Sequence, residues 1–194
     1  MRPQTAETNT MTAISVSRPH SGRVALVTGS TSGIGLAIAG RLASLGADIA
    51  LHGLGKPEDI EHVVKALRKR HDVHVQHFEG DFTDSSCFVP MIECIAAALG
   101  APDILINNAG MQYVSPILSF PPEKWDMMLA VNLSASFHTI RLCAPAMLKK
   151  GWGRIINMAS VSGLVGVADK PAYVATKHGL VGLTKSVALE FVAA

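Results

Sequence analysis

The chain has 194 residues, of which 48% are hydrophobic and 16% are charged, and its formal net charge at pH 7 is +2. This length fits one domain with a substantial core, and the composition excludes a disordered chain. The Lys and Arg residues form no block, which disfavours nucleic acid as a partner. No apolar run approaches the roughly 18 to 20 residues that span a bilayer, so we also expect no membrane partner.

Three cysteines, Cys87, Cys94 and Cys143, show neither a CxxC pair nor the spacing of a disulfide framework. Reduced thiols and a cytoplasmic location are therefore expected, and we predict no metal site. The first 21 residues are rich in Thr, Ser and Pro and lack the apolar segment of a signal peptide. We expect residues 1–21 to be a flexible tail and residues 22–194 to form one domain.

From Arg23 onward, short apolar runs alternate with amphipathic segments. The runs with strand character are 23–28, 48–52, 73–78, 103–108 and 153–159, whereas helices are expected over 34–46, 57–70, 86–100, 122–150 and 170–190. Strict alternation of strand and helix predicts an α/β fold with a parallel sheet and right-handed crossovers. In such sheets ligands bind beyond the carboxyl ends of the strands.

The first predicted strand ends in TGSTSGIG, which leads directly into a helix. Gly29, Gly33 and Gly35 allow positive φ and a close approach of backbone to a pyrophosphate, and the helix N-terminus offers free N–H groups. The hydroxyl groups of residues 30–32 add donors. An ordinary tight turn is the alternative. A P-loop is disfavoured, since no Lys-Ser/Thr pair follows the glycines.

Other polar residues follow the later strands or lie in helices. NNAG (107–110) ends the fourth strand, Ser160 follows the fifth, and Asn132 lies inside a helix, where asparagine has a poor propensity. Tyr173 and Lys177, four residues apart, share one helix face. Singly, these residues have structural explanations: a turn or cap, a buried bond to backbone, and a surface pair. Together they are expected at one sheet edge, opposite the glycine-rich turn.

This set of motifs resembles the short-chain dehydrogenase/reductase family from Arg23 to the end of the chain. The resemblance implies a Rossmann-type doubly wound parallel sheet with helices on both faces. It also implies a catalytic tetrad of Asn132, Ser160, Tyr173 and Lys177. A phenol is ordinarily a poor base at neutral pH, but a neighbouring ammonium group and an oxidised nicotinamide favour the phenolate.

In the roles that the resemblance implies, Tyr173 takes the proton of a substrate hydroxyl and Ser160 hydrogen-bonds the substrate oxygen. Lys177 also holds the nicotinamide ribose, and Asn132 positions a water. The implied cofactor-binding residues are Gly29, Ser30, Thr31, Gly33, Ile34, Gly35, Asp81, Phe82, Asn108, Ala109, Gly110, Tyr173 and Lys177. The second strand is followed by Gly53 and Leu54 instead of an acidic residue, and Ser32 stands where many NADP-selective relatives carry Arg. Lys56 lies close by, and we favour NAD over NADP.

Within the family, the D-3-hydroxybutyrate dehydrogenases are the most similar branch, through NNAGMQYVSPI (107–117), NLSASFHTIRL (132–142) and WGRIINMAS (152–160). This resemblance implies a small 3-hydroxy acid or keto acid as substrate, with Gln112 and Lys170 on its carboxylate. The substrate residues are then Gln112, Ser160, Ser162, Lys170 and Tyr173. Ser162 departs from the branch, which commonly has His there, so the substrate stays open.

Family members continue for about sixty residues beyond this sequence, so we expect the last two strands and the lid to be missing. The fifth strand would then be an apolar edge. A homo-oligomer is expected, a dimer here and a tetramer at full length. Two alternatives stay open: an NADPH-dependent 3-oxoacyl reductase, and a truncated, non-catalytic dinucleotide-binding remnant.

Overall fold

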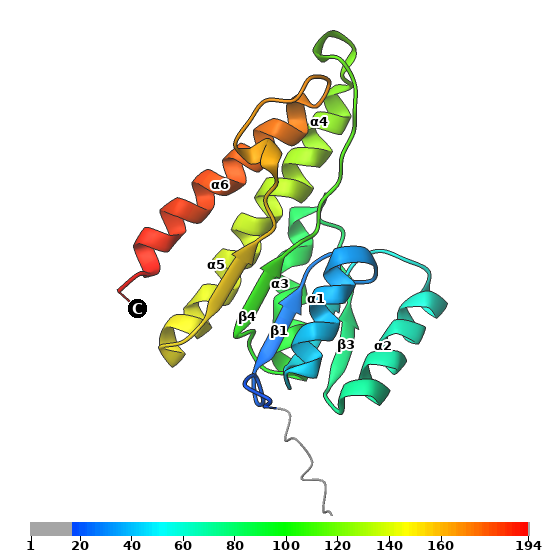
Figure 1. Ribbon diagram of the computed structural model, residues 1–194, viewed down its shortest axis with the longest axis vertical. Helices are drawn as coiled ribbons and strands as arrows, with labels where there is room; N and C mark the ends of the chain where they lie inside the picture. Colours follow the sequence, from blue (N-terminus) through cyan, green and yellow to red (C-terminus); the bar gives the residue numbers. More distant parts are fainter. Residues whose placement is uncertain (1–16, 194) are drawn as a thin grey trace, which may run out of the picture.

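Five parallel strands form the centre of the molecule: β1 (Val24–Val27), β2 (Asp48–His52), β3 (Val75–Phe78), β4 (Ile104–Asn107) and β5 (Arg154–Asn157). The computed structural model describes residues 17–193. The strand order is β3-β2-β1-β4-β5, which makes the sheet that of a Rossmann-type fold (Figure 1). All five strands were predicted. Several of them begin or end one or two residues inside the predicted apolar runs.

Helices separate these strands along the chain. They are α1 (Gly33–Ser44), α2 (Pro57–His71), α3 (Phe88–Ala98), α4 (Pro122–Leu129), α5 (Ala135–Lys150) and α6 (Pro171–Phe191). A π-helical turn, Ala130–Ser134, joins α4 to α5 in one continuous helical stretch (Figure 1). The sequence predicts this stretch over 122–150 but not the π-helical turn inside it. None of the described helices is both long and apolar enough to cross a bilayer.

Two apolar cores lie on opposite faces of the sheet, because successive strand residues point to opposite sides. In β1, Ala25 and Val27 pack with α1 and α2, through residues such as Ala39 and Leu67. Val24 and Leu26 pack on the other face, against residues of α3 and α5. Helices thus cover both faces, as predicted for a doubly wound sheet.

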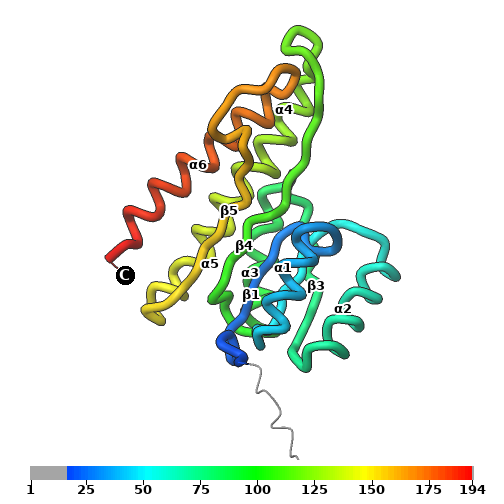
Figure 2. The backbone as a smooth tube through the Cα atoms, in the orientation of Figure 1, coloured from blue at the N-terminus to red at the C-terminus, as the bar shows by residue number. Residues whose placement is uncertain are grey.

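Strand order reverses at β1, which pairs with β2 on one side and with β4 on the other. Connections from β1 and from β4 therefore leave the sheet toward opposite faces, and a crevice opens beyond the carboxyl ends of these two strands. Figure 2 shows the chain after β4 rising away from the sheet toward the start of α4. Because β5 pairs only with β4 among the described strands, it is an edge strand, as expected.

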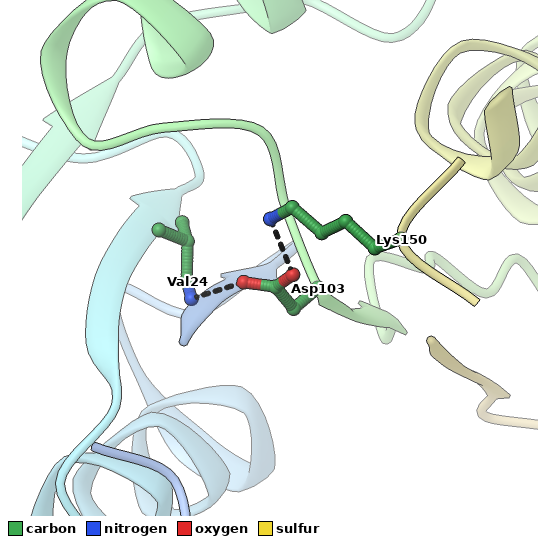
Figure 3. Close-up of polar contacts among 3 residues, drawn as sticks. All are labelled: Val24, Asp103 and Lys150. Carbon is green, nitrogen blue, oxygen red and sulfur yellow. Dashed lines mark hydrogen bonds and ion pairs between the residues drawn. The ribbon is translucent and has the colours of Figure 1, made fainter. Parts of the chain in front are cut away.

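At the amino-terminal ends of the strands, opposite the crevice, Asp103 links β1 to α5. Its Oδ2 accepts from the backbone N–H of Val24 at 3.0 Å, and its Oδ1 accepts from Lys150 Nζ at 2.6 Å. Figure 3 shows this carboxylate between the first strand and the end of α5. The side chain of Asp103 is only 7% exposed, so both bonds compensate a buried charge.

The predicted tail, residues 1–21, lies mostly outside the described residues. Of its last part, Arg18 donates from Nη2 to the carbonyl oxygens of His71 and Asp72, at 2.9 and 3.0 Å. These are carbonyls at the C-terminal end of α2, where a cation is favourable. The backbone N–H of His20 also donates to the carbonyl of Leu45 at 3.0 Å.

Candidate active site

The glycine-rich turn after β1 allows a very close approach of three backbone segments. Gly29 has φ of +62°, and a Cβ there would lie 2.8 Å from the Cα of Ala109. A Cβ on Gly35 would lie 2.2 Å from the carbonyl oxygen of Gly29 and 2.6 Å from Asn108 Nδ2. Gly33 also has positive φ, +54°, but open space around it. Helix α1 therefore begins directly against the turn, with its N–H groups facing the crevice.

Thr28 and Asn108 lock this turn to the end of β4. The Thr28 hydroxyl oxygen accepts from the backbone N–H groups of Asn108 and Ala109, both at 3.0 Å. In return, Asn108 Nδ2 donates to the carbonyl oxygens of Thr28 and Gly29, at 3.0 and 2.9 Å. No role was predicted for Thr28, because its partners come from the end of β4, 80 residues later in the chain.

The serine and threonine after Gly29 face different ways. Ser30 is fully buried, and its hydroxyl donates to the carbonyl oxygen of Val27 at 2.6 Å. Thr31 Oγ1 donates to the carbonyl oxygen of Leu54 at 3.0 Å, which links the turn to the loop after β2. The side chain of Ser30 is thus used inside the fold, whereas Thr31 lies at the crevice.

A cleft of about 530 Å³ lies at these carboxyl ends. Its walls include seven of the residues predicted to bind the cofactor: Gly29, Thr31, Asp81, Phe82, Asn108, Ala109 and Gly110. Ser30, Gly33, Ile34 and Gly35 are not among its lining residues. Of these four, Ile34 is 66% exposed at the start of α1.

Asp81, in the loop after β3, lines one side of the cleft, and its hydrogen bonds favour the charged carboxylate. Its Oδ1 accepts from the backbone N–H of Thr83 at 2.9 Å and from the Thr83 hydroxyl at 2.8 Å. These two bonds lower the pKa of the Asp81 carboxyl. They engage only Oδ1, so Oδ2 is directed elsewhere.

His52, the last residue of β2, was not predicted as a site residue. Its Nε2 lies 2.9 Å from the carbonyl oxygen of Gly80, and its Nδ1 lies 3.4 Å from the backbone nitrogen of Gly29. The ring stacks on Phe82 with 4.0 Å between centroids. Burial lowers the pKa of His52 to about 4, so the ring is neutral at physiological pH.

Asn132 lies in the π-helical turn and is 1% exposed. Its Oδ1 accepts from the backbone N–H of Met111 at 2.8 Å, and its Nδ2 donates to the carbonyl oxygen of the same residue at 2.9 Å. Nδ2 also lies 3.3 Å from the hydroxyl of Thr176 on α6. The buried bond to backbone that would explain an asparagine inside a helix is therefore present.

Lys177 points from α6 into the same corner. Its Nζ donates to the carbonyl oxygen of Met158 at 2.6 Å and lies 5.7 Å from the centre of the Tyr173 ring. Burial lowers the pKa of this ammonium group. A Cβ on Gly110 would lie 3.4 Å from Asn132 Oδ1 and 3.9 Å from Lys177 Nζ. Asn132, Lys177 and the NNAG turn therefore converge on one point.

Ser160 follows β5 and begins a short turn, Val161–Gly163, that packs on α6. Its Oγ accepts from the backbone N–H of Ser162 at 3.1 Å, so the hydroxyl hydrogen is free to point to a ligand. A Cβ on Gly163 would lie 2.8 Å from the carbonyl oxygen of Lys177, which shows how tightly the turn meets the helix. This close packing brings Ser160 to the helix that carries Tyr173 and Lys177.

Two of the predicted substrate residues, Gln112 and Lys170, lie on different segments of the chain. Gln112 is exposed on the segment after β4, and Lys170 is half-buried at the start of α6. One bond joins these segments: the backbone N–H of Ser115 donates to the carbonyl oxygen of Asp169 at 2.8 Å. Ser162 is buried, and the bond it makes is the one that its backbone gives to Ser160.

Two relatives are similar over most of the described residues. The D-beta-hydroxybutyrate dehydrogenases of Rhizobium meliloti strain 1021 and Cupriavidus necator are 54% and 47% identical to this chain. Each alignment covers 87% of this chain and 65% of the relative, so the chain spans just under two thirds of their length.

Solved structures and a family model agree with this similarity. A gluconate 5-dehydrogenase from Burkholderia cenocepacia J2315, in complex with NADP and tartrate, has a TM-score of 0.81 at 33% identity, covering 89% of this chain and 67% of that one. A metagenomic short-chain oxidoreductase in complex with NADP has a TM-score of 0.84 at 38% identity, covering 89% and 78%. The family model for short chain dehydrogenases matches residues 23–193. Because that match takes in nearly every described residue and the fold is the same, the chain belongs to the short-chain dehydrogenase family.

Proposed function

We propose that this chain transfers hydride between NAD and a small 3-hydroxy acid, with D-3-hydroxybutyrate and acetoacetate as the substrate pair. The observation that carries the proposal is the convergence of Asn132 and Lys177 on the NNAG turn, beside the glycine-lined cleft. The 54% identical relative supports the choice of substrate.

A nicotinamide dinucleotide fits the residues of this cleft. At Gly29 and Gly35 there is no room for a Cβ, so α1 begins directly against the turn, and the N–H groups at the start of α1 would bind the pyrophosphate. Thr31 would lie at the phosphates and Asp81 Oδ2 at the adenine amino group, with Lys177 on the nicotinamide ribose. When bound, the dinucleotide supplies the acceptor or donor of the hydride.

The choice of NAD over NADP rests on the missing arginine in the turn after β1, since the acidic residue of many NAD enzymes is missing too. Gly53 and Leu54 stand where an acidic residue holds the ribose 2′-hydroxyl in many NAD enzymes, and Ser32 stands where an Arg would bind a 2′-phosphate.

The four polar residues divide the proton chemistry. Tyr173 accepts the proton of the substrate hydroxyl, and the buried Lys177 ammonium lies 5.7 Å from the centre of its ring. Ser160, whose Oγ already accepts from Ser162, donates its hydroxyl hydrogen to the substrate oxygen. Asn132 holds the backbone of Met111 and so positions the chain beside Lys177.

Gln112 and Lys170 would pair with the substrate carboxylate. The segments that carry them are linked by the bond from the Ser115 N–H to the Asp169 carbonyl oxygen, which supports this pairing. A cation that is half-buried is suited to a carboxylate that loses water on binding. Ser162 would be a weaker hydrogen-bond partner of the same carboxylate.

The test is NADH formation from D-3-hydroxybutyrate at mildly alkaline pH, in this chain and in a version extended to the length of its relatives. We expect Tyr173→Phe to lower kcat by at least about a hundredfold, with NAD affinity unchanged. Gln112→Ala and Lys170→Ala should raise KM for the acid more than they lower kcat. A preference for NADPH and a 3-oxoacyl substrate, or NAD binding without turnover in either version, would overturn the proposal.

We also infer that the protein assembles through α5 and works in a reducing compartment, the cytoplasm. On α5, Phe137 and Leu148 are 49% and 43% exposed, although both are large and apolar. None of the three cysteines forms a disulfide in the described structure. Light scattering should give the mass of a dimer, and Phe137→Glu with Leu148→Glu should give that of a monomer.

A further inference from the structure

Two histidines on neighbouring strands each contact a backbone carbonyl of the loop that follows the other strand. His52 at the end of β2 reaches Gly80, after β3, with 2.9 Å from Nε2 to the carbonyl oxygen. His77 on β3 reaches Gly53, after β2, with 2.8 Å from Nε2 to the carbonyl oxygen. The two strands pair in parallel with His77 opposite Leu51, so the contacts cross between them.

The partners of His52 fix its tautomer. A carbonyl oxygen can only accept, so Nε2 of His52 carries the hydrogen and donates to Gly80. The backbone N–H of Gly29 can only donate, so Nδ1 is bare and accepts from it at 3.4 Å. This one ring therefore links the glycine-rich turn after β1 to the loop that carries Asp81 and Phe82.

Other contacts hold the ring in place. Phe82 stacks on it, and the backbone nitrogen of His52 donates to the buried hydroxyl of Ser30 at 3.1 Å. The titratable groups in this corner are His77, Asp81 and Cys87, and no ion pair joins any of them to the ring in the described part of the chain. His52 is 3% exposed, and burial is the main reason that its pKa is lowered, with a smaller contribution in the same direction from the charge of His77.

We propose that His52 and His77 form a reciprocal brace that sets the spacing of the two loops around the adenosine half of the dinucleotide. Both are positioning residues: they act through Gly29, Gly53 and Gly80, and not by touching the reacting atoms. The inference rests on the proposed binding of a dinucleotide in this cleft. The brace should affect the affinity for the adenosine half of the dinucleotide and should not affect the rate of hydride transfer.

The experiment is calorimetric titration of the chain with NAD and with AMP, which carries only the adenosine half. His52→Asn keeps an acceptor near Gly29, His52→Gln keeps a donor near Gly80, and His52→Phe keeps only the stacking on Phe82. We expect His52→Phe and His77→Phe to weaken NAD and AMP equally, each by about tenfold, and the Asn and Gln variants of His52 to lose less. His74→Gln, at an exposed histidine before β3, should change nothing.

Nitrogen chemical shifts give a readout that a loss of stability would not move. In the wild type, the His52 signals should report a neutral ring protonated on Nε2, and AMP should shift the signals of His52 and His77 but not those of His74. Wild-type affinity for AMP in folded Phe variants, or in the Asn and Gln variants if the Phe variants fail to fold, would overturn the brace. If the wild type binds neither NAD nor AMP, the proposed function itself fails.

Discussion

One amide side chain, that of Asn132, joins three separate segments of the site. It bonds both backbone groups of Met111 after β4 and reaches Thr176 on α6. A helix interior disfavours asparagine, and here the side chain is fully used for contacts outside its own helix. Its position in the π-helical turn widens the helix at the residue that must reach out.

Replacing Asn132 with Ala should cost about 1 to 3 kcal/mol of unfolding free energy, because Met111 is left with an unpaired N–H and an unpaired carbonyl. Urea unfolding followed by circular dichroism would measure this loss. Thr176→Val removes only the longer contact to Asn132 and the bond to the Tyr173 carbonyl, so it should cost less. Equal stability of Asn132→Ala and wild type would contradict the role assigned to this amide.

At the level of elements, the glycine-rich turn and α1 work as one unit. The helix begins so close to Gly29 that its third residue, Gly35, cannot carry a side chain. Thr28 and Asn108 then fix the turn against β4 with hydrogen bonds of 2.9 to 3.0 Å. The cleft therefore depends on packing of backbone against backbone, which only glycine permits.

Gly35→Ala should abolish NAD binding, because the new methyl group would overlap the Gly29 carbonyl and Asn108 Nδ2. Gly40→Ala, on the same helix, is the matched control: its Cβ would lie 3.6 Å from Leu67, an ordinary contact. That change should leave affinity alone and stabilise the helix by about 0.5 to 1 kcal/mol. Titration with NAD and thermal unfolding of both variants would decide, and similar affinities would show that the turn tolerates a side chain.

The order and type of these elements could be predicted from the sequence, since β1 to β5 are short apolar runs between amphipathic segments. The glycine turn was also predictable, because its residue types and spacing are specific, whereas the tetrad stays a prediction from the family resemblance. His52 and Thr28 were not predictable, since their roles depend on neighbours that strand pairing brings close, Gly80 in one case and Asn108 in the other. Spacing likewise did not show that Ser30 is buried.

Across the whole molecule, buried polar groups hold the sheet at both ends. Asp103 ties β1 to α5 at the amino-terminal end of the strands, and His52 ties the turn after β1 to the loop after β3 at their carboxyl-terminal end. The buried ring of His52 fits the fold only in its neutral state. The protein's stability must therefore depend on pH.

The free energy of unfolding should fall as the pH drops from about 6.5 to about 4, because the pKa of His52 is about 4 in the folded protein and 6.5 in an unstructured peptide. In this window the unfolded chain binds a proton that the folded chain excludes, so stability rises with pH. The loss reaches about 3 kcal/mol below pH 4 and vanishes above pH 7. Urea unfolding at several pH values should show that the free energy of unfolding of the wild type rises with pH, and that of His52→Gln should rise less steeply. Equal slopes against pH would contradict the pKa assigned to His52.

The central position of β1 also has a consequence for how the protein is made. This strand leaves the ribosome before the other four described strands, yet one of its two partners is β4, and Thr28 forms its hydrogen bond with Asn108, 80 positions later. Contacts between such distant segments form slowly, because the intervening chain must be ordered first. Capture of a nucleotide should therefore be among the last abilities that a nascent chain acquires, and it would mark the moment when the sheet has closed around its first strand.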